Sequence, residues 1–299
     1  MPLLLSAGHT VVGLTRSPAK ADAIRRAGAA AAIADALNRA AAIVEAVVVA
    51  QPDVIVHEMT SLSGANDLRR FDRSFSLTNR LRTEGLQNLL AAAKQAGTPR
   101  IVVQSFCGPY ARIGGPVKSE EDPLDPEPPR KLRRTLQAIR YLESAVTSSP
   151  NIKGVVLRYG AFYGPWTGLL DGPMIDRLRR RRVPLIGDAN GWWSLLHIDD
   201  AAAATATAVE RGAPGIYNIV DDEPAPVRDW LPALAALLGP RPPRHIPKSL
   251  ARIAAGEHIV TMMTEARAGS NAKAKPDLAW QPAHSSWRRG FAAVLSQCE

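Results

Sequence analysis

The amino-acid sequence predicts an α/β protein with a doubly wound parallel sheet and a smaller C-terminal lobe. Over the first 159 residues, short apolar segments alternate with Ala-rich helical segments, which is the rhythm of repeated βαβ units. Apolar segments such as "DVIVH" and "RIVVQSF" show no polar alternation, so we expect burial of both faces, as in a parallel sheet. After Gly160 the rhythm breaks, and Gly, Pro and Trp become frequent, which indicates the second lobe.

The composition disfavours several classes of protein. No apolar run approaches the length of a bilayer span, so we expect no membrane segment. Two cysteines in 299 residues rule out a disulfide framework and are typical of a reducing, cytoplasmic compartment. The net charge is +9, with Arg clusters at residues 130–134 and 177–182. Since neither cluster is interleaved with aromatic residues, we interpret both as solvated helix faces rather than a nucleic-acid site. An anionic cofactor or substrate would also suit the charge.

Local signals predict the first elements in order. We expect a strand over residues 9–15, followed by a helix that has Ser17 as its N-cap and ends at Gly28. A weak strand over 30–35, a helix over 43–50 and a buried strand over 52–59 follow.

The next elements are more distinct. They are an amphipathic helix over Thr83–Ala96 closed by Gly97, a strand over 99–106, a Pro-rich acidic loop over 114–129, a helix over Arg133–Val146 and a strand over 152–160. We therefore assign residues 1–159 to the larger domain, with a return segment at about 193–222. Residues 160–192 and 223–299 form the smaller, substrate-binding lobe in this interpretation.

The first residues, "PLLLSAGH", resemble the end of a helix in the middle of a βαβ unit. Such a helix follows a strand and a tight turn, which in a Rossmann-like dinucleotide fold carries a Gly-rich phosphate loop. The sequence contains neither G-x-G-x-x-G nor G-x-x-G-x-x-G. We therefore expect the first strand of the sheet to be missing, together with roughly fifteen to twenty residues before Met1. The alternative, a chain that begins at Met1, leaves two neighbouring strand edges unpaired.

Eight segments in a fixed order carry a resemblance to a known family. They are "AGHTVVGLTRSPAK", "DALN", "DVIVHEM", "TEGLQNLLAAAKQAG", "VVQSFCGPYA", "LRYGAFYGP", "HIDDAAAA" with "GIYNIVDDEPAPVRDWL", and "LAWQPAHSSWRRGF". Together they resemble the extended short-chain dehydrogenase/reductases, also called the NAD-dependent epimerase/dehydratase family, over essentially the whole chain. The resemblance implies a Rossmann-like fold, a bound dinucleotide and a small-molecule substrate between the two lobes.

The resemblance also implies where the cofactor lies. The matching positions are Thr15, Arg16, Asp35, Ala36, His57, Glu58, Ser105 and Tyr159. At the end of the second strand of this fold, a carboxylate binds the ribose 2′-hydroxyl of NAD, whereas an Arg accommodates the 2′-phosphate of NADP. Because Arg16 stands there with Lys20 nearby, we expect NADP rather than NAD. The alternative is that Arg16 only caps a solvated loop.

The catalytic positions depart from the family pattern. The family typically uses Ser or Thr at the end of the fifth strand and Tyr-x-x-x-Lys on the next helix, one turn apart, for proton relay. None of the five tyrosines is followed four residues later by Lys, and Thr135 and Ile139 stand at the two positions. Ser105 and Tyr110 are therefore our candidates for catalysis.

The remaining candidates concern substrate and metal. By the resemblance, the substrate would lie against Tyr110, Phe162, Tyr163, Trp192 and Trp193. No H-E-x-x-H or C-x-x-C spacing occurs, so we expect no metal.

Several other side chains have structural interpretations. We interpret Cys107 as an inert core thiol, His57 as a satisfied core residue and His197 with Asp199 and Asp200 as a structural element. Glu58 is harder to dismiss, because ligands bind at the carboxyl ends of parallel strands.

Three functions remain open from the sequence. The first is an NAD(P)-dependent oxidoreductase or epimerase-like enzyme with a non-standard site, acting on a small carbonyl or sugar-nucleotide-type substrate. The second is a non-catalytic NAD(P)-binding sensor or scaffold, and the third is a fragment with impaired cofactor binding. The oligomeric state also remains open from the sequence, although the helices at Thr83–Ala96 and Arg133–Val146 resemble those that pair subunits into homodimers in the family.

Overall fold

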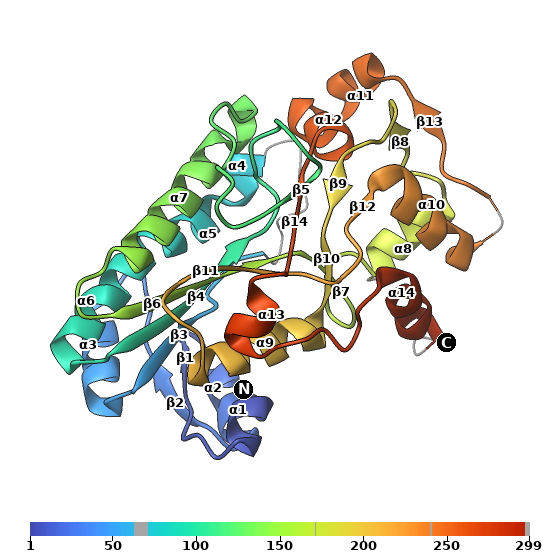
Figure 1. Ribbon diagram of the computed structural model, residues 1–299. Helices are drawn as coiled ribbons and strands as arrows, with labels where there is room; N and C mark the ends of the chain where they lie inside the picture. The colour runs from blue at the N-terminus through green and yellow to red at the C-terminus, as the bar shows by residue number, and fades with distance from the viewer. Residues whose placement is uncertain (63–70, 171, 240, 297–299) are drawn as a thin grey trace.

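Four parallel strands form the central sheet of the larger lobe in this computed structural model, which describes residues 1–62, 71–170, 172–239 and 241–296 (Figure 1). The strand order is β11-β6-β4-β3. These strands are β3 (Val54–His57), β4 (Arg100–Phe106), β6 (Lys153–Tyr159) and β11 (Gly215–Ile219). Ile101, Val102 and Val103 on β4 are all fully buried, because helices cover both faces of the sheet. The predicted α/β fold with a parallel sheet is confirmed.

A second parallel pair lies beside this sheet. It consists of β1 (Val12–Thr15) and β2 (Ala30–Ile33), with Thr15 opposite Ile33 at their carboxyl ends. Within the described residues, no strand bridges β1 and β3. The parallel sheet is therefore in two parts, with the interruption where the sequence predicts a missing strand.

Helices pack on both faces of the sheet (Figure 1). One face carries α3 (Ala40–Ala50), α6 (Leu86–Ala96) and α7 (Arg133–Thr147), and the other carries α9 (Ile198–Glu210) and α13 (Ala274–Leu278). On the α7 face, Leu86 and Leu142 are fully buried in one apolar core. On the α9 face, Ala204 and Leu278 are fully buried in another. This two-sided covering is the doubly wound arrangement that the sequence predicts.

The helix boundaries follow the local signals. The α2 helix (Pro18–Arg26) begins after Ser17, whose hydroxyl accepts a hydrogen bond from the backbone N–H of Lys20 at 3.5 Å. The α6 helix ends at Gly97, which has a φ of 71° that glycine adopts without a Cβ penalty. A π-helical segment, η2 (Leu81–Gly85), precedes α6. Shorter helices in this lobe are α1 (Pro2–Ser6), α4 (Phe71–Ser74) and α5 (Ser76–Arg80).

The chain leaves the central sheet at Gly160. A Cβ on this residue would lie 2.8 Å from the carbonyl oxygen of Ser194, so the backbones approach too closely for a side chain. The smaller lobe contains short strands and helices: β7 (Ala161–Tyr163), β8 (Leu185–Ile186), β9 (Trp192–Trp193), β10 (Leu195–His197), β12 (Ala225–Pro226), β13 (His245–Ile246), α8 (Gly172–Arg179), α10 (Val227–Leu238), α11 (Lys248–Ala255), α12 (Glu257–Thr264) and α14 (Trp287–Ser296). Trp230, Trp287 and Phe291 lie in its buried core.

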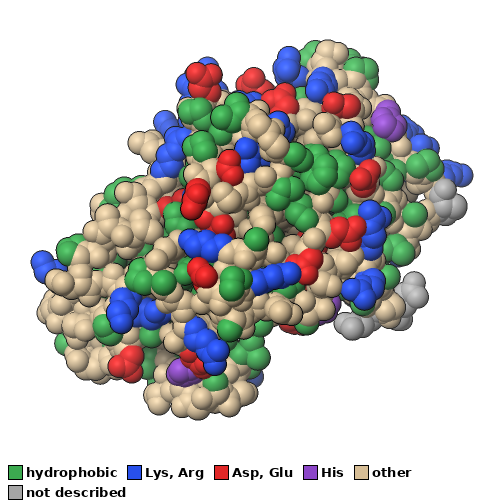
Figure 2. All heavy atoms as spheres, viewed as in Figure 1, with side chains coloured by type: hydrophobic (Ala, Val, Ile, Leu, Met, Phe, Trp, Pro, Cys, Tyr) green, Lys and Arg blue, Asp and Glu red, His purple; other side chains and the backbone are tan. Residues whose placement is uncertain are grey.

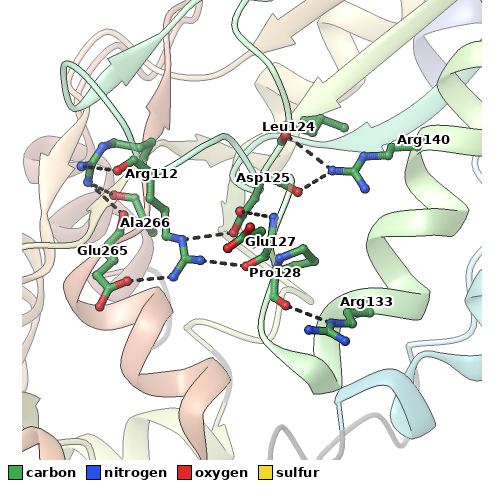
Figure 3. A network of polar contacts seen from close by, with 10 residues as sticks. Arg112, Leu124, Asp125, Glu127, Pro128, Arg133, Arg140, Glu265 and Ala266 are labelled. Atoms are coloured by element: carbon green, nitrogen blue, oxygen red, sulfur yellow. Dashed lines mark hydrogen bonds and ion pairs between the residues drawn. The ribbon is translucent and has the colours of Figure 1, made fainter.

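A network of polar contacts fixes the Pro-rich loop between the lobes (Figure 3). Arg112 pairs with Asp125 at 3.1 Å and with Glu265, just after α12, at 2.8 Å. Arg140 on α7 donates to the carbonyl oxygens of Leu124 and Asp125. The loop contains the short strand β5 (Val117–Lys118), which pairs with β14 (Ala268–Gly269). The 3-10 helix η3 (Arg130–Leu132) follows the loop. These contacts hold the Pro-rich loop, α7 and the second lobe together around the carboxyl edge of the sheet.

The surface carries charges of both signs. In Figure 2, Lys and Arg side chains are scattered among acidic ones over the face shown, with no continuous basic patch. Among the described residues, no helix combines the length and apolar character needed to cross a membrane.

Candidate functional site

The topology places the candidate site at the carboxyl ends of β1 and β3. The chain runs from β2 through α3 to β3 and so crosses from one part of the sheet to the other. Such a reversal of strand order is where open α/β sheets bind their ligands.

The residues after β1 and β2 lie together at one end of this edge. Arg16 is exposed, and its positive charge contributes to a lowered pKa of Asp35. The larger cause is a hydrogen bond from the backbone N–H of Leu37, at 2.8 Å, and Asn38 donates from its side chain at 2.8 Å. The Asp35 carboxylate therefore stabilises its own turn.

Two neighbouring residues, Thr15 and Ala36, also form hydrogen bonds within the protein. Thr15 accepts a hydrogen bond from the backbone N–H of Ser17 at 3.2 Å. Ala36 is buried, and its carbonyl accepts from the side-chain amide of Asn88 at 2.7 Å. An exposed guanidinium beside this ordered turn fits the adenosine end of a dinucleotide, whereas the described edge holds no Gly-rich turn for a pyrophosphate.

His57, the last residue of β3, is a core residue. Its ring is 1% exposed, with Nε2 3.2 Å from the Leu81 carbonyl oxygen and Nδ1 3.2 Å from the Met59 backbone N–H. Nε2 therefore carries the proton and Nδ1 accepts. Burial lowers the His57 pKa to about 4, so the ring is neutral at physiological pH. These contacts leave the ring no free polar atom for a cofactor.

Glu58 follows directly and has different surroundings. Part of the residue is exposed, yet the packed atoms around its carboxyl raise the pKa to about 7. The Tyr159 hydroxyl, at the end of β6, lies 3.1 Å from Glu58 Oε1 and 2.6 Å from Thr205 Oγ1 on α9. Tyr159 is 3% exposed. A titratable carboxyl thus lies between the ligand-binding edge of the sheet and the hydroxyl pair of Tyr159 and Thr205.

Ser105 and Tyr110, the predicted catalytic residues, belong to a buried network. Ser105 donates to Glu143 Oε1 at 2.7 Å, and the same carboxylate accepts two hydrogen bonds from Arg158, at 2.8 and 2.6 Å. The Tyr110 hydroxyl accepts from Arg158 at 3.0 Å and donates to Asn218 at 2.6 Å. Tyr110 is 1% exposed, and burial raises its pKa. In this structure both side chains are engaged in holding β4, β6 and α7 together, and Tyr110 is closed to a substrate.

The neighbouring thiol is also buried. Burial raises the pKa of Cys107 to about 12, so the nucleophilic thiolate is scarce at neutral pH. Cys298, the other cysteine, lies outside the described residues.

The positions that usually hold Tyr and Lys serve packing here. Thr135 is 2% exposed and donates to Asp72 Oδ1 at 2.7 Å, while the Thr135 and Arg134 backbone N–H groups also donate to that carboxylate. Asp72 on α4 therefore caps the first turn of α7. Ile139, one turn later, is 2% exposed in the apolar interior.

The predicted substrate residues divide into exposed and buried ones. Tyr163 is fully buried against Phe291 in the second-lobe core, whereas Phe162 and Trp192 are half-buried. Phe162 also contacts the Tyr159 ring, with 5.4 Å between the ring centroids. Trp193 donates to the Met262 carbonyl oxygen at 2.9 Å. Of these four residues, only Phe162 and Trp192 are both partly exposed and without a side-chain hydrogen bond in the described structure.

His197 and the two aspartates after it are structural. His197 Nδ1 accepts from the Asp199 backbone N–H at 3.2 Å at the start of α9. Asp200 accepts from the backbone N–H groups of Ala283 and His284 at 2.7 and 2.9 Å. Nowhere in the described residues do three or more His, Cys, Asp or Glu side chains form a group suited to a metal ion.

Two polar residues were not singled out from the sequence. Thr205 lies on the face of α9 that carries Ala201 and Ala208, and a hydroxyl at that i, i+4, i+7 spacing could have signalled a buried partner. His258 on α12 is 3% exposed and packs on Phe71 at 4.4 Å, and neither ring nitrogen has a hydrogen-bond partner among the described residues. Its contact with Phe71 joins segments far apart in sequence, so no local signal predicts it.

Comparison with known proteins agrees with this arrangement. The model of the NAD dependent epimerase/dehydratase family matches residues 1–220. A 3-diazoavenalumate denitrifying reductase of Streptomyces sp is 41% identical over 292 residues, which cover 96% of this chain and 93% of that protein. A 2-alkyl-3-oxoalkanoate reductase of Stenotrophomonas maltophilia (strain K279a) is 29% identical over 166 residues, covering 52% and 49%.

Solved structures share the fold. UDP-glucose 4-epimerase of Thermotoga maritima, with UDP-glucose, superposes with a TM-score of 0.73 at 19% identity, covering 98% of this chain and 92% of that one. The UDP-glucose 4-epimerase of Thermus thermophilus, in complex with NAD, gives 0.71 at 22% identity with the same coverage, 98% and 92%. With the family match over residues 1–220, these findings show that the chain belongs to the NAD-dependent epimerase/dehydratase family.

Proposed function

We propose that this chain is an NAD(P)H-dependent reductase that removes a diazo group from a small organic acid. The observation that carries the proposal is the pair of residues at the usual relay positions. Thr135 and Ile139 are buried and cannot replace Tyr and Lys as proton donors. The relative that covers 96% of this chain is a denitrifying reductase of a diazo compound.

The chemistry explains why such a site can lack the relay. A reduced nicotinamide, when bound, supplies a hydride. Reduction of a carbonyl leaves an oxyanion, which Tyr-x-x-x-Lys normally protonates. In a diazo substrate, the electron pair of the breaking C–N bond leaves with neutral N₂, so no oxyanion forms on a leaving atom. Phe162 and Trp192 would give an organic acid apolar surface between the lobes.

We also propose that the cofactor is NADPH. The exposed Arg16 guanidinium at the end of β1 suits a 2′-phosphate, and the nearby Asp35 carboxylate is engaged in its own turn.

Carbonyl reduction is the second candidate. It is favoured by the 29% identity, over about half of the chain, to a 2-alkyl-3-oxoalkanoate reductase. It requires a proton donor other than Thr135 and Ile139.

One experiment separates these functions. The purified chain is titrated with NADPH and NADH by nucleotide fluorescence, and then given either a ¹⁵N-labelled neutral diazo carboxylate or a 3-oxo acid. We expect release of labelled N₂ and, from deuterated NADPH, a new C–D bond, both above the rate with heat-denatured protein. Turnover of the 3-oxo acid alone would favour carbonyl reduction. Nucleotide binding with no turnover of either compound would favour a sensor.

A further inference from the structure

The hydroxyl chain behind Glu58 has one arrangement in which every contact has a proton of its own. Thr205 Oγ1 donates its single proton to the Ala201 carbonyl oxygen at 2.7 Å. The 2.6 Å contact between Tyr159 and Thr205 must then use the single proton of Tyr159. With an ionised Glu58, Tyr159 would donate the 3.1 Å hydrogen bond to Glu58 Oε1 and its one proton would serve two acceptors, whereas a neutral Glu58 supplies its own proton to this contact. The geometry therefore fits a neutral Glu58 carboxylic acid.

This acid lies where a substrate would react. Glu58 directly follows β3, next to the point where the strand order reverses, and part of it is exposed. Tyr159 from β6 contacts its carboxyl, and Thr205 from α9 contacts the Tyr159 hydroxyl in turn. No charged side chain in the described structure contributes to the Glu58 pKa. His57 beside it is neutral and bonded elsewhere.

We propose that Glu58 is the proton donor of the reduction, with its carboxyl positioned by the hydroxyl chain of Tyr159 and Thr205; this inference rests on the proposed function. A neutral diazo carbon takes the Glu58 proton and becomes a diazonium group. Hydride addition at that carbon forms the second C–H bond, and the C–N bond breaks with its electron pair leaving in N₂. Glu58, now a carboxylate, recovers a proton from water through its exposed side. For a carbonyl substrate, the same proton would go to the oxyanion.

The first test replaces the acid. Glu58→Gln keeps a donor toward Tyr159 but has no acidic proton, so we expect kcat to fall about 100-fold with KM and NADPH affinity nearly unchanged. In the wild type kcat should fall as pH rises through about 7, because the Glu58 carboxylic acid ionises. This falling limb of the pH–rate profile should be absent in E58Q. Glu45→Gln, the same change on an exposed part of α3, is the matched control. An E58Q enzyme with the wild-type rate and pH profile would overturn the proposal.

The second test changes the hydroxyl chain. Thr205→Val removes the acceptor of the Tyr159 proton, which is then free to donate to an ionised Glu58. That bond stabilises the carboxylate and lowers the Glu58 pKa, so the falling limb of the pH profile should move to lower pH. A purely structural Thr205 would leave the limb in place, and that result would contradict the positioning role.

A third measurement does not depend on turnover. The infrared difference spectrum between wild type and E58Q should contain a protonated-carboxyl C=O band at pH 6 that is lost by pH 8. If the band is absent at pH 6, Glu58 does not hold a proton and the proposal fails. If the band is present but neither substrate class is reduced, the proposed function fails, and with it the donor role.

Discussion

Trp166 is the most exposed large hydrophobic side chain of the described structure. It is 102% exposed and has a φ of 64°. It lies with Pro165 at the centre of a turn, which Thr167 closes by donating from Oγ1 to the Gly164 carbonyl at 2.7 Å. A bulky residue in the left-handed region is strained. Trp166→Gly should therefore raise the free energy of unfolding by about 0.5–1 kcal/mol in urea denaturation. Trp166→Phe, which keeps a Cβ, should give no gain, and equal values for the two variants would show that the turn is unstrained.

Arg16 governs the cofactor preference in our proposal. Arg16→Glu replaces the cation with an anion at the end of β1, which should repel a 2′-phosphate and accept hydrogen bonds from a 2′-hydroxyl. We expect the ratio of the NADPH Kd to the NADH Kd to rise at least tenfold, or about 1.4 kcal/mol, as measured by fluorescence titration. Arg252→Glu makes the same change on exposed α11 in the other lobe and should leave the ratio unchanged. An unchanged ratio in R16E would mean that Arg16 only caps its loop.

The sequence predicts the positions of some functional residues but not the surroundings of others. The position of Glu58 follows from its place after a buried strand, and that of Arg16 from the end of the strand before Ser17. The burial of Tyr110 could not be foreseen, because its partners Asn218 and Arg158 are 108 and 48 residues away. The same holds for Thr135, whose partner Asp72 lies on another helix. Local periodicity shows which face of an element is apolar, but not which distant polar group satisfies a buried hydroxyl.

At the scale of elements, the predictions from pattern held well. Strands expected over 52–59, 99–106 and 152–160 correspond to β3, β4 and β6, since continuous apolar runs mark buried parallel strands. The Pro-rich loop at 114–129 is different. Its sequence predicts no regular structure, and its fixed position comes from Arg112 and Arg140, which anchor it from outside.

This loop depends on a partly buried ion pair. Asp125 is 6% exposed and pairs with Arg112 at 3.1 Å. Arg112→Met leaves that carboxylate without its cation, so we expect a loss of about 2 kcal/mol in the free energy of unfolding. Adding Asp125→Asn should recover part of the loss. Arg288→Met breaks an exposed pair with Glu223 and should cost less than about 1 kcal/mol. An R112M loss no larger than that of R288M would contradict the anchoring role.

At the scale of the whole molecule, the parallel sheet with helices on both faces agrees with the pattern of the sequence. β2-β1 and β11-β6-β4-β3 are separate in the described residues, and the sequence contains no Gly-rich turn of the kind that follows the first strand in a Rossmann-like sheet. The division into lobes is less simple than the sequence indicates. Ala274, Leu278 and Trp280, from the C-terminal part, pack against α9 in the core of the larger lobe, and no local composition change marks this return.

Buried titratable groups make the stability of the molecule depend on pH. Burial raises the Asp221 pKa to about 8 and lowers the pKa values of His57 and His258 to about 4. Between pH 4 and 8 native Asp221 keeps a proton that the unfolded chain has lost, so its effect is to reduce stability as pH rises. Between pH 4 and 6.5 the unfolded chain binds protons at the two histidines that the native chain does not, so their effect is to increase stability as pH rises.

Glu58, whose pKa is raised to about 7, acts with the same sign as Asp221. Two carboxyls and two histidines therefore oppose each other below pH 6.5, and mainly the carboxyl effect remains above it. We therefore expect the free energy of unfolding to be nearly level from about pH 5 to 6.5 and to fall by about 1–2 kcal/mol between pH 6.5 and 8. Urea denaturation at fixed ionic strength measures this directly. Asp221→Asn should remove most of the fall, because the native side chain no longer carries a proton that must be lost. A wild-type stability that rises from pH 6.5 to 8 would mean that Asp221 is ionised in the folded protein.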